Sequence, residues 1–344
     1  MDILRIATRQ SPLALWQAEF VKAKILTIYP NMHIELVSFV TEGDKKLDQN
    51  LAKIGGKGLF TKELESALLC KKVDIAIHSV KDMTVKIANR LILGAVCQRD
   101  DPRDALICSA SLYPSDLKKP DRPRPHETSQ HSQTYVRMAN GDKHNPRISK
   151  MMGINVTQLA DLPHGAVIGT SSSRRASLLQ EIRPDLSVKM LRGNVGTRLK
   201  KLDDGEYDAI ILAAAGLHRL GRSHRINAYL PPETWIPAVG QGAIGVECHI
   251  DHSPLLASLL SALDHTPTRR CIIAERHFNA ALNGGCELPI AAYAVEVNGE
   301  LQMRSFMAHP EKPLFFRAEL NGSADDPAAL GEKLAALLKS KMDY

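Results

Sequence analysis

Long apolar runs are missing from this sequence. No window approaches the roughly 18 apolar residues that a membrane-spanning helix needs, and the stretch from Met1 to Arg9 lacks the apolar core of a secretory signal. We therefore expect a cytoplasmic protein without membrane association.

Paired cysteine motifs are also missing. No Cys-x-x-Cys pair occurs, and no histidine spacing suits a zinc site. We expect reduced thiols and no bound metal. The six scattered cysteines are Cys70, Cys97, Cys108, Cys248, Cys271 and Cys286.

The chain has neither a phosphate-binding loop of the Walker type nor the glycine triplet of a dinucleotide-binding fold. Its 44 Lys and Arg residues against 38 Asp and Glu residues give a net charge of +6, without a basic run typical of nucleic-acid binding. The excess favours small anionic ligands, and carboxylates fit better than nucleotides.

At 344 residues, the chain is longer than one hydrophobic core usually supports, so we expect two or three domains. Short apolar runs alternate with helical patterns from the start, which predicts parallel βαβ units. The segments concerned are 4–7, 12–29, 34–40, 61–69 and 73–78.

A second series of the same kind follows and also predicts an α/β domain. Its segments are 166–169, 174–182, 186–190, 195–202 and 208–213. The phrases Val73 to Ile77 and Tyr207 to Ile211 are similar, which suggests two similarly built domains facing a cleft, although two buried strands can also resemble each other by chance. Ligands of open α/β sheets favour the carboxyl ends of strands.

From Pro267 the pattern changes to a helix through Asn283, three strand-like runs (291–297, 301–308 and 314–320) and a final helix, 327–342. This order predicts a small α+β domain. By contrast, Ser115 to Thr157 is polar, and we interpret it as a mobile surface insertion with a regulatory or partner-binding arm as the alternative.

Two strand-to-helix turns combine hydroxyls or glycines with arginines. The segment 169–175 has three serines followed by Arg174 and Arg175, and the segment 191–198 has Asn194, which we expect to cap a helix, before Arg198. Paired arginines at a helix N-terminus are unfavourable for the helix dipole, which favours an anion site over simple capping.

Three further segments carry reactive groups but are ambiguous by themselves. Asp82 follows a buried strand and is suited to stabilising a cation, or to capping the next element. The glycine-rich stretch 54–60, with Lys53 and Lys57, fits a lid or an ordinary connection. Cys286 follows two glycines, although free cysteines are usually buried small hydrophobes.

Taken together, these segments closely resemble the hydroxymethylbilane synthase (porphobilinogen deaminase) family over nearly the whole chain, except 115–157. The segments that carry the resemblance are 5–14, 55–65, 78–82, 101–105, 169–175, 191–198, 237–242 and 284–286.

The resemblance implies an α/β fold with two periplasmic-binding-protein-like α/β domains around a cleft and a small α+β C-terminal domain. It places domain 1 at 1–98 and 241–262, domain 2 at 103–236 with the insertion 115–157, and domain 3 at 265–344. It also implies a monomer that takes porphobilinogen as its small-molecule substrate and binds no nucleic acid.

The resemblance further implies a dipyrromethane cofactor attached covalently to Cys286, and a catalytic role for Asp82. Positions matching the family's other cofactor contacts are Ser11, Lys81, Asp82, Thr170, Ser172, Arg174, Arg175, Arg192 and Arg198. Positions matching substrate contacts are Arg9, Arg219 and Gln241, and Lys53 and Lys57 match the mobile loop.

Five residues depart from the family pattern: Met83, Thr84, Ser173, His218 and Glu287. The proline missing after Asp82 removes a backbone restraint. A carboxylate at Glu287, beside the attachment sulfur, would raise the thiol pKa and slow cofactor loading.

The implied activity is that of a transferase in haem and porphyrin biosynthesis. It deaminates four porphobilinogen molecules, joins them head to tail on the cofactor, and releases hydroxymethylbilane by hydrolysis. Two alternatives stay open: a non-catalytic carboxylate-binding module, which the missing export and DNA-binding segments disfavour, and a transferase without a covalent cofactor, which would not need Cys286.

Overall fold

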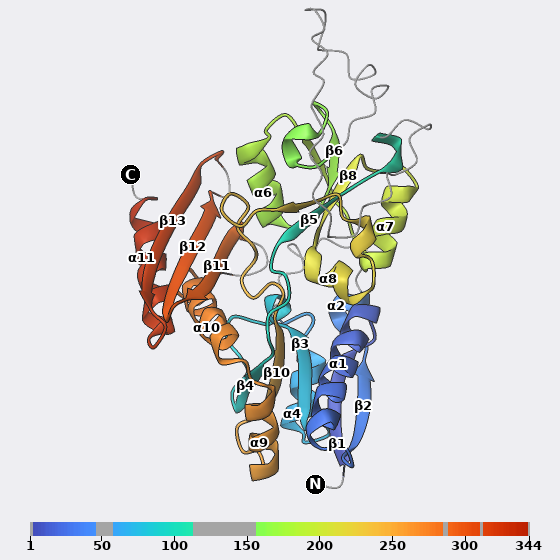
Figure 1. Cartoon of the computed structure of the whole chain (residues 1–344), viewed down its shortest axis with the longest axis vertical. Helices are drawn as coiled ribbons and strands as arrows, with labels where there is room; N and C mark the ends of the chain where they lie inside the picture. The colour runs from blue at the N-terminus through green and yellow to red at the C-terminus, as the bar shows by residue number, and fades with distance from the viewer. Residues whose placement is uncertain (1–2, 46–57, 113–155, 285–287, 310–311, 343–344) are drawn as a thin grey trace, which may run out of the picture.

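The computed structural model describes residues 3–45, 58–112, 156–284, 288–309 and 312–342. Within these ranges the chain forms two five-stranded sheets and one three-stranded sheet. The first sheet lies at the end that holds the N-terminus, the second at the opposite end, and the third beside them (Figure 1).

The first sheet has the strand order β2-β1-β3-β10-β4. Its strands are β1 (Ile3–Arg9), β2 (His33–Phe39), β3 (Ile75–Ser79), β4 (Leu91–Val96) and β10 (Ile244–His249). Helices α1 (Pro12–Ile28) and α9 (Pro254–Leu263) supply the apolar core on one face, and α4 (Lys62–Leu69) supplies the core on the other.

The second sheet has the order β7-β6-β8-β5-β9. Its strands are β5 (Asp104–Cys108), β6 (Val167–Gly169), β7 (Ser187–Lys189), β8 (Ala209–Ala213) and β9 (Ala228–Leu230). Helix α6 (Ser173–Ile182) packs into one core, whereas α7 (Val195–Asp203) and α8 (Ala214–Arg219) pack into the other.

The two sheets follow the same plan, which confirms that the two α/β units are similarly built. In each, the first strand (β1 or β6) lies between two parallel partners, and β3 and β8, which carry the similar phrases, take the same place. The prediction of parallel units is incomplete, because β10 and β5 are antiparallel to their neighbours. We call each five-stranded sheet with its helices a lobe. The chain enters β10 from the second lobe through the crossing segment 231–243, and it enters β5 from the first lobe through the crossing segment 97–103.

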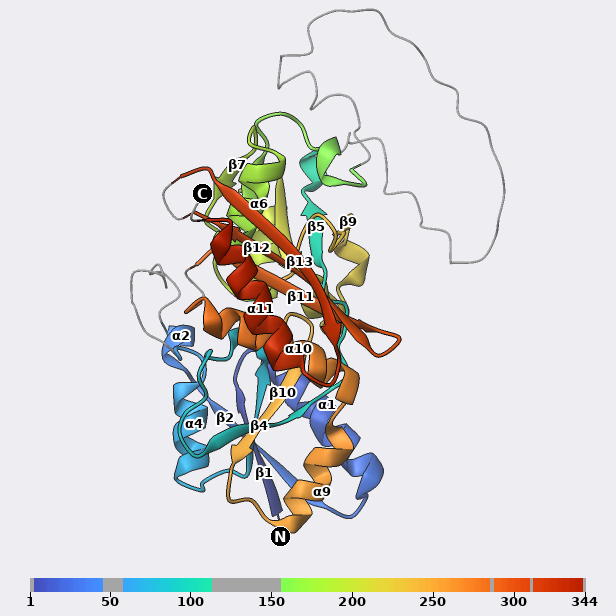
Figure 2. The same cartoon turned by 90° about the vertical axis from the view of Figure 1, so that its left-hand side faces the viewer.

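The third sheet is an antiparallel meander of β11 (Ile290–Val297), β12 (Glu300–Ala308) and β13 (Phe315–Ser323). Helices α10 (Thr266–Ala281) and α11 (Pro327–Ser340) cover one face. The other face supplies Ala291 and Phe306 to the core beside α6, and Figure 2 shows the sheet next to that helix. The predicted α/β class and the small C-terminal α+β unit are therefore confirmed.

The end of the expected insertion needs a correction. Most of 115–157 lies outside the described residues, but Val156 is buried in the core beside α6. The backbone N–H and Oγ1 of Thr157 both donate to Asp161 Oδ2, at 2.8 and 2.9 Å. These two residues are therefore part of the second lobe.

Among the residues that the structure describes, no helix is long and apolar enough to span a bilayer. Among the same residues, no three His, Cys, Asp or Glu side chains are grouped closely enough to hold a metal ion.

Candidate active site

A pocket lies at the carboxyl ends of β1 and β3, where open α/β sheets usually bind ligands. Its lining includes Arg9 from β1, Ser11 and Gln17 from the start of α1, and His78 and Asp82 from β3 and the turn after it. The structure thus brings together three residues that the sequence analysis assigned to cofactor or substrate: Arg9, Ser11 and Asp82.

The turn that carries Asp82 is held on both sides. A single 3₁₀ turn, Val80–Asp82, follows β3, and the backbone N–H of Val80 donates to Ala243 O at 3.1 Å. Gln17 Nε2 donates to Ser79 Oγ at 2.8 Å. Gly240 permits this packing, because a Cβ there would lie 2.5 Å from Val80 Cγ1.

Positive charge gathers around Asp82. Burial is the main cause that lowers the pKa of Lys81 to about 8. Arg175 and Arg198 contribute to this lowering, and Asp82 partly opposes it. Burial is likewise the main cause that lowers the pKa of Arg198 to about 10, and Arg175 and Arg192 contribute to this lowering. Because like charges in a buried cluster repel one another, the arrangement favours a bound anion.

The cluster has donor capacity that internal partners do not use. Nε of Arg192 and Nε of Arg175 are buried without a hydrogen-bond partner, whereas Arg198 Nε donates to Gly193 O at 2.7 Å. Asn194 caps α7 by accepting from the Thr197 N–H, as the sequence predicts. Buried unpaired donors are costly, so their presence points to a ligand with acceptor oxygens.

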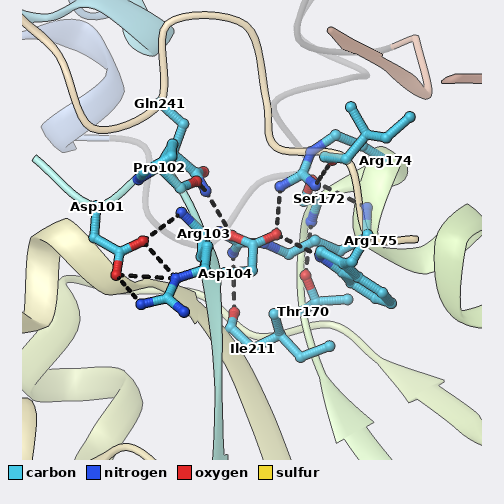
Figure 3. A network of polar contacts seen from close by, with 12 residues as sticks. Asp101, Pro102, Arg103, Asp104, Thr170, Ser172, Arg174, Arg175, Ile211 and Gln241 are labelled. Atoms are coloured by element: carbon cyan, nitrogen blue, oxygen red, sulfur yellow. Dashed lines mark hydrogen bonds and ion pairs between the residues drawn. The ribbon is translucent and has the colours of Figure 1, made fainter. Parts of the chain in front are cut away.

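Asp104 on β5 organises the other arginines (Figure 3). Arg174 Nη2 donates to its Oδ2, and Arg175 Nη2 to its Oδ1, both at 2.7 Å. Trp235 Nε1 and Gln241 Nε2 also donate to this carboxylate, at 2.7 and 2.9 Å. Burial alone would raise the pKa of Asp104, but the two guanidinium groups hold it well below its usual range.

This arrangement differs from the expected anion loop. Arg174 Nη1 donates to Ile236 O, and Arg175 Nη1 donates to Ile211 O, so internal acceptors occupy these groups as well. The sequence analysis missed Asp104, although the segment 101–105 was among those carrying the resemblance. An internal carboxylate separated by 70 residues from Arg174 gives no local signal.

The hydroxyl groups of the predicted site serve as local caps in the structure. Ser172 Oγ accepts from the Arg175 N–H at the start of α6, and Thr170 Oγ1 accepts from the Ser172 N–H. Ser11 Oγ accepts from the Ala14 N–H at the start of α1 while it lines the pocket.

Of the predicted substrate contacts, Gln241 lies in the crossing segment 231–243, and Arg219, at the end of α8, contacts that segment. Arg219 Nη2 donates to Gly242 O at 2.6 Å, and its Nε lies 3.4 Å from an Asp100 carboxylate oxygen. Gln241 Nε2 donates to Pro102 O at 2.7 Å, but its Oε1 is buried without a partner. Both side chains are therefore close to the junction of the two large lobes.

Cys286, Lys53, Lys57 and the departure at Glu287 lie outside the described residues. Gly284 is the last described residue before Cys286, and its N–H donates to Asn279 O at 2.9 Å just beyond α10. A Cβ at Gly284 would meet Asn279 Oδ1 at 1.8 Å, so a larger residue there would require the Asn279 side chain to move.

Two departures from the family pattern have visible partners. Arg276 of α10 donates through Nη2 to the carbonyl oxygens of Thr84 and Val85, at 3.0 and 3.1 Å, which restrains the segment where a proline is missing. His218 lies 3.1 Å from Asp100 Oδ1 and 3.0 Å from the Tyr229 hydroxyl.

Family models match most of the chain. The model described as "Porphobilinogen deaminase, dipyromethane cofactor binding domain" matches residues 4–124 and 125–257. The model described as "Porphobilinogen deaminase, C-terminal domain" matches residues 269–340.

Similar solved structures include periplasmic binding proteins and an effector-binding domain. A Salmonella typhimurium periplasmic binding protein with high arginine specificity is 10% identical, with coverage of 76% of this chain and 92% of that chain and a TM-score of 0.36. The methionine-binding protein MetQ is 11% identical, with coverage of 76% of this chain and 90% of that chain and a TM-score of 0.38. The BenM effector-binding domain with benzoate is 14% identical, with coverage of 76% of this chain and 90% of that chain and a TM-score of 0.39. These TM-scores are too low to support a functional conclusion.

Proposed function

The chain belongs to the porphobilinogen deaminase family, and we propose that Asp82 is its catalytic carboxylate and Cys286 its cofactor attachment site. It is a transferase that performs the hydroxymethylbilane synthase reaction of tetrapyrrole biosynthesis with a dipyrromethane cofactor. Four porphobilinogen molecules are deaminated and joined head to tail, and hydrolysis releases the product. This assignment sets aside the receptor and the cofactor-free transferase.

The observation that carries the proposed site is one carboxylate, Asp82, at the pocket beside a group of cations. Porphobilinogen has two carboxylates, which the cations suit, and it becomes an electron-poor azafulvenium cation when ammonia leaves. The carboxylate of Asp82 accepts hydrogen bonds from pyrrole N–H groups and stabilises this cation. Its oxygen then takes up the proton lost from the pyrrole carbon as each carbon–carbon bond forms.

The residues around Asp82 fit a cofactor that carries carboxylates. The unpaired Nε groups of Arg175 and Arg192 provide free donors, and Lys81 and Arg198 add positive charge. When bound, dipyrromethane supplies the pyrrole carbon to which the first substrate is joined. We assign its acidic groups to these four side chains, with Ser11, Thr170, Ser172 and Arg174 as supporting contacts.

Substrate acid groups are assigned to Arg9 and Arg219, with Gln241 as a further polar contact. Arg9 lines the pocket beside Asp82, which supports its assignment directly. Gln241 lies in the crossing segment 231–243 and Arg219 contacts that segment, so their use in binding requires the two large lobes to adjust.

We also keep the domain division as a proposal, with domain 1 at 1–98 and 241–262, domain 2 at 103–236 and domain 3 at 265–344. The three sheets support it, because β10 belongs to the first sheet although it follows the second in sequence. Lys53 and Lys57 are assigned to a mobile loop. A cytoplasmic monomer is proposed from the family resemblance.

Intact-mass spectrometry tests the covalent part of this proposal. Protein from cells that make porphobilinogen should exceed its sequence mass by two linked pyrrole units, and Cys286→Ala should remove the excess. After brief exposure to porphobilinogen, rapid quenching should reveal protein species that differ by one pyrrole unit. Unmodified wild-type protein, or product formation without those species, would contradict attachment at Cys286.

A further inference from the structure

Arg9, the pocket residue assigned to a substrate carboxylate, already has a carboxylate partner in this structure. Its Nε donates to Asp44 Oδ2 at 3.2 Å, and its Nη2 donates to Asp44 Oδ1. The two side chains are about one-fifth and one-quarter exposed, at 20% and 24%, so solvent and ligands reach the pair. The geometry is the two-point pairing that a guanidinium group also makes with a ligand carboxylate.

The surroundings hold this pair in place. Asp44 lies in the short helix α2 (Glu42–Lys45), whose start is fixed because Thr41 Oγ1 donates to Asp44 Oδ2 at 2.7 Å. The Phe60 ring covers Arg9, with its centroid 4.3 Å from the guanidinium carbon. Gly43 allows that ring to approach, because a Cβ there would lie 2.2 Å from Phe60 Cε1.

Two backbone N–H groups of α2 donate hydrogen bonds to residues on either side of Phe60. The Gly43 N–H donates to Leu59 O at 2.9 Å, and the Glu42 N–H donates to Glu63 Oε1 at 2.9 Å. These contacts hold Asp44 against Arg9, and Arg9 itself lines the same pocket as Asp82.

We propose that Asp44 is an internal substitute for the substrate carboxylate, which occupies Arg9 until porphobilinogen displaces it. This inference rests on the proposed assignment of Arg9 to substrate. One acid group replaces another on the same guanidinium group, and no covalent bond changes. Substrate affinity at this point is therefore set by the difference between two similar ion pairs.

The exchange has a consequence for selectivity. A ligand without an acid group leaves the Arg9–Asp44 pair intact and gains no ion pair with Arg9. A carboxylate ligand breaks the Arg9–Asp44 pair but forms an equivalent ion pair with Arg9 in its place. Asp44 thereby makes Arg9 select for carboxylates, at the cost of weaker binding for all of them.

The test replaces Asp44 by Asn, which keeps an acceptor oxygen for the Thr41 hydroxyl but removes the competing charge. The measured quantity is the porphobilinogen concentration that gives half of the maximal rate of the first addition to loaded enzyme. Because pairs of this exposure contribute modestly, D44N should lower this concentration by about twofold to fivefold, with little change in the maximal rate. Asp44→Glu, which retains the charge, should not lower it.

A double variant identifies the route of the effect. In an Arg9→Gln background, which binds substrate less well, D44N should no longer lower the half-saturating concentration. Asp251→Asn is the matched control, because Asp251 pairs with Arg90 at 2.7 Å on the exposed surface away from the pocket, and it should change neither quantity.

An unchanged or higher half-saturating concentration in folded D44N overturns the proposal, since a purely orienting carboxylate would weaken binding when removed. A decrease that persists in the Arg9→Gln background also overturns it. If D44N does not fold, Asp44→Ser, which removes the charge and keeps a short acceptor, is measured against the same criteria. Failure of the proposed function is distinguishable, because wild type would then show no addition at all.

Discussion

Arg99 and Glu275 form a two-point ion pair, with Nη1–Oε1 and Nη2–Oε2 separations of 2.6 and 3.2 Å. Glu275 of α10 is fully buried and also accepts from the N–H groups of Gly240 and Ala294, at 2.7 and 2.9 Å. Arg99 Nε donates to Gln241 O. One carboxylate thus joins both crossing segments to the C-terminal sheet.

Glu275→Gln should therefore destabilise the protein strongly. The variant leaves Arg99 without its charge partner and turns an amide NH2 toward donors, and losing one partner of a buried pair costs about 3 to 5 kcal/mol. Urea and thermal denaturation measure the loss. Glu319→Gln is the control, because Glu319 is an exposed partner of Arg304, and its variant should unfold with a nearly normal midpoint. Equal midpoints for the two variants would show that Glu275 does not join the segments.

Asp82→Asn should leave the fold and the bound cofactor largely intact while turnover falls by orders of magnitude. Asn preserves size and polarity but removes the negative charge beside the developing cation, and each 1.4 kcal/mol of lost transition-state stabilisation is roughly a tenfold loss in rate. Product formation and intact mass are measured on the same sample. Near-normal turnover by loaded Asp82→Asn would exclude the proposed catalytic role.

Replacing Arg174 by Ala should mainly lower stability, whereas replacing Arg192 by Ala should mainly impair cofactor loading or elongation. The Arg174 guanidinium is used by Asp104 and Ile236 O, so its loss should lower stability by about 1.5 to 3 kcal/mol. Arg192 has a free Nε, so Arg192→Ala should keep its denaturation midpoint and instead impair loading or stall elongation.

Denaturation and mass spectrometry before and after substrate distinguish these outcomes. An arginine that holds the cofactor blocks loading, whereas one that holds incoming substrate permits loading but changes the distribution of extended species. A destabilised Arg192→Ala with normal loading would reverse the assignment.

Lys81 should make the stability of cofactor-free protein rise with pH. Its folded pKa of about 8 lies below its ordinary value of 10.5. Between these values the unfolded chain binds more protons than the folded chain, so the free energy of unfolding increases from about pH 8 to about pH 10.5 through this group. Urea denaturation of Cys286→Ala, with and without Lys81→Met, isolates the contribution. If the pKa of Lys81 is not lowered in the folded protein, the difference in unfolding free energy between the two variants should not change with pH.

Local patterns in the sequence were enough to predict the helices and most of the strands. Apolar periodicity located β1 to β3 and β6 to β8, and the switch after Pro267 located the C-terminal sheet. The same patterns placed Asp82 at a strand end and Asn194 at a helix start, because strand exits and helix caps depend on neighbouring residues. The family resemblance, confirmed by the matched family models, supplied the activity and cofactor.

Only the tertiary structure decided which charges pair. Asp104 meets Arg174 across 70 residues, Arg9 meets Asp44 across 35, and Arg99 meets Glu275 across 176. The antiparallel strands β5 and β10 are likewise placed by chain crossings between lobes. A sequence records that a residue is charged, but its free energy in the fold depends on burial and on partners brought close by packing, so the roles of these arginines could not be separated by sequence alone.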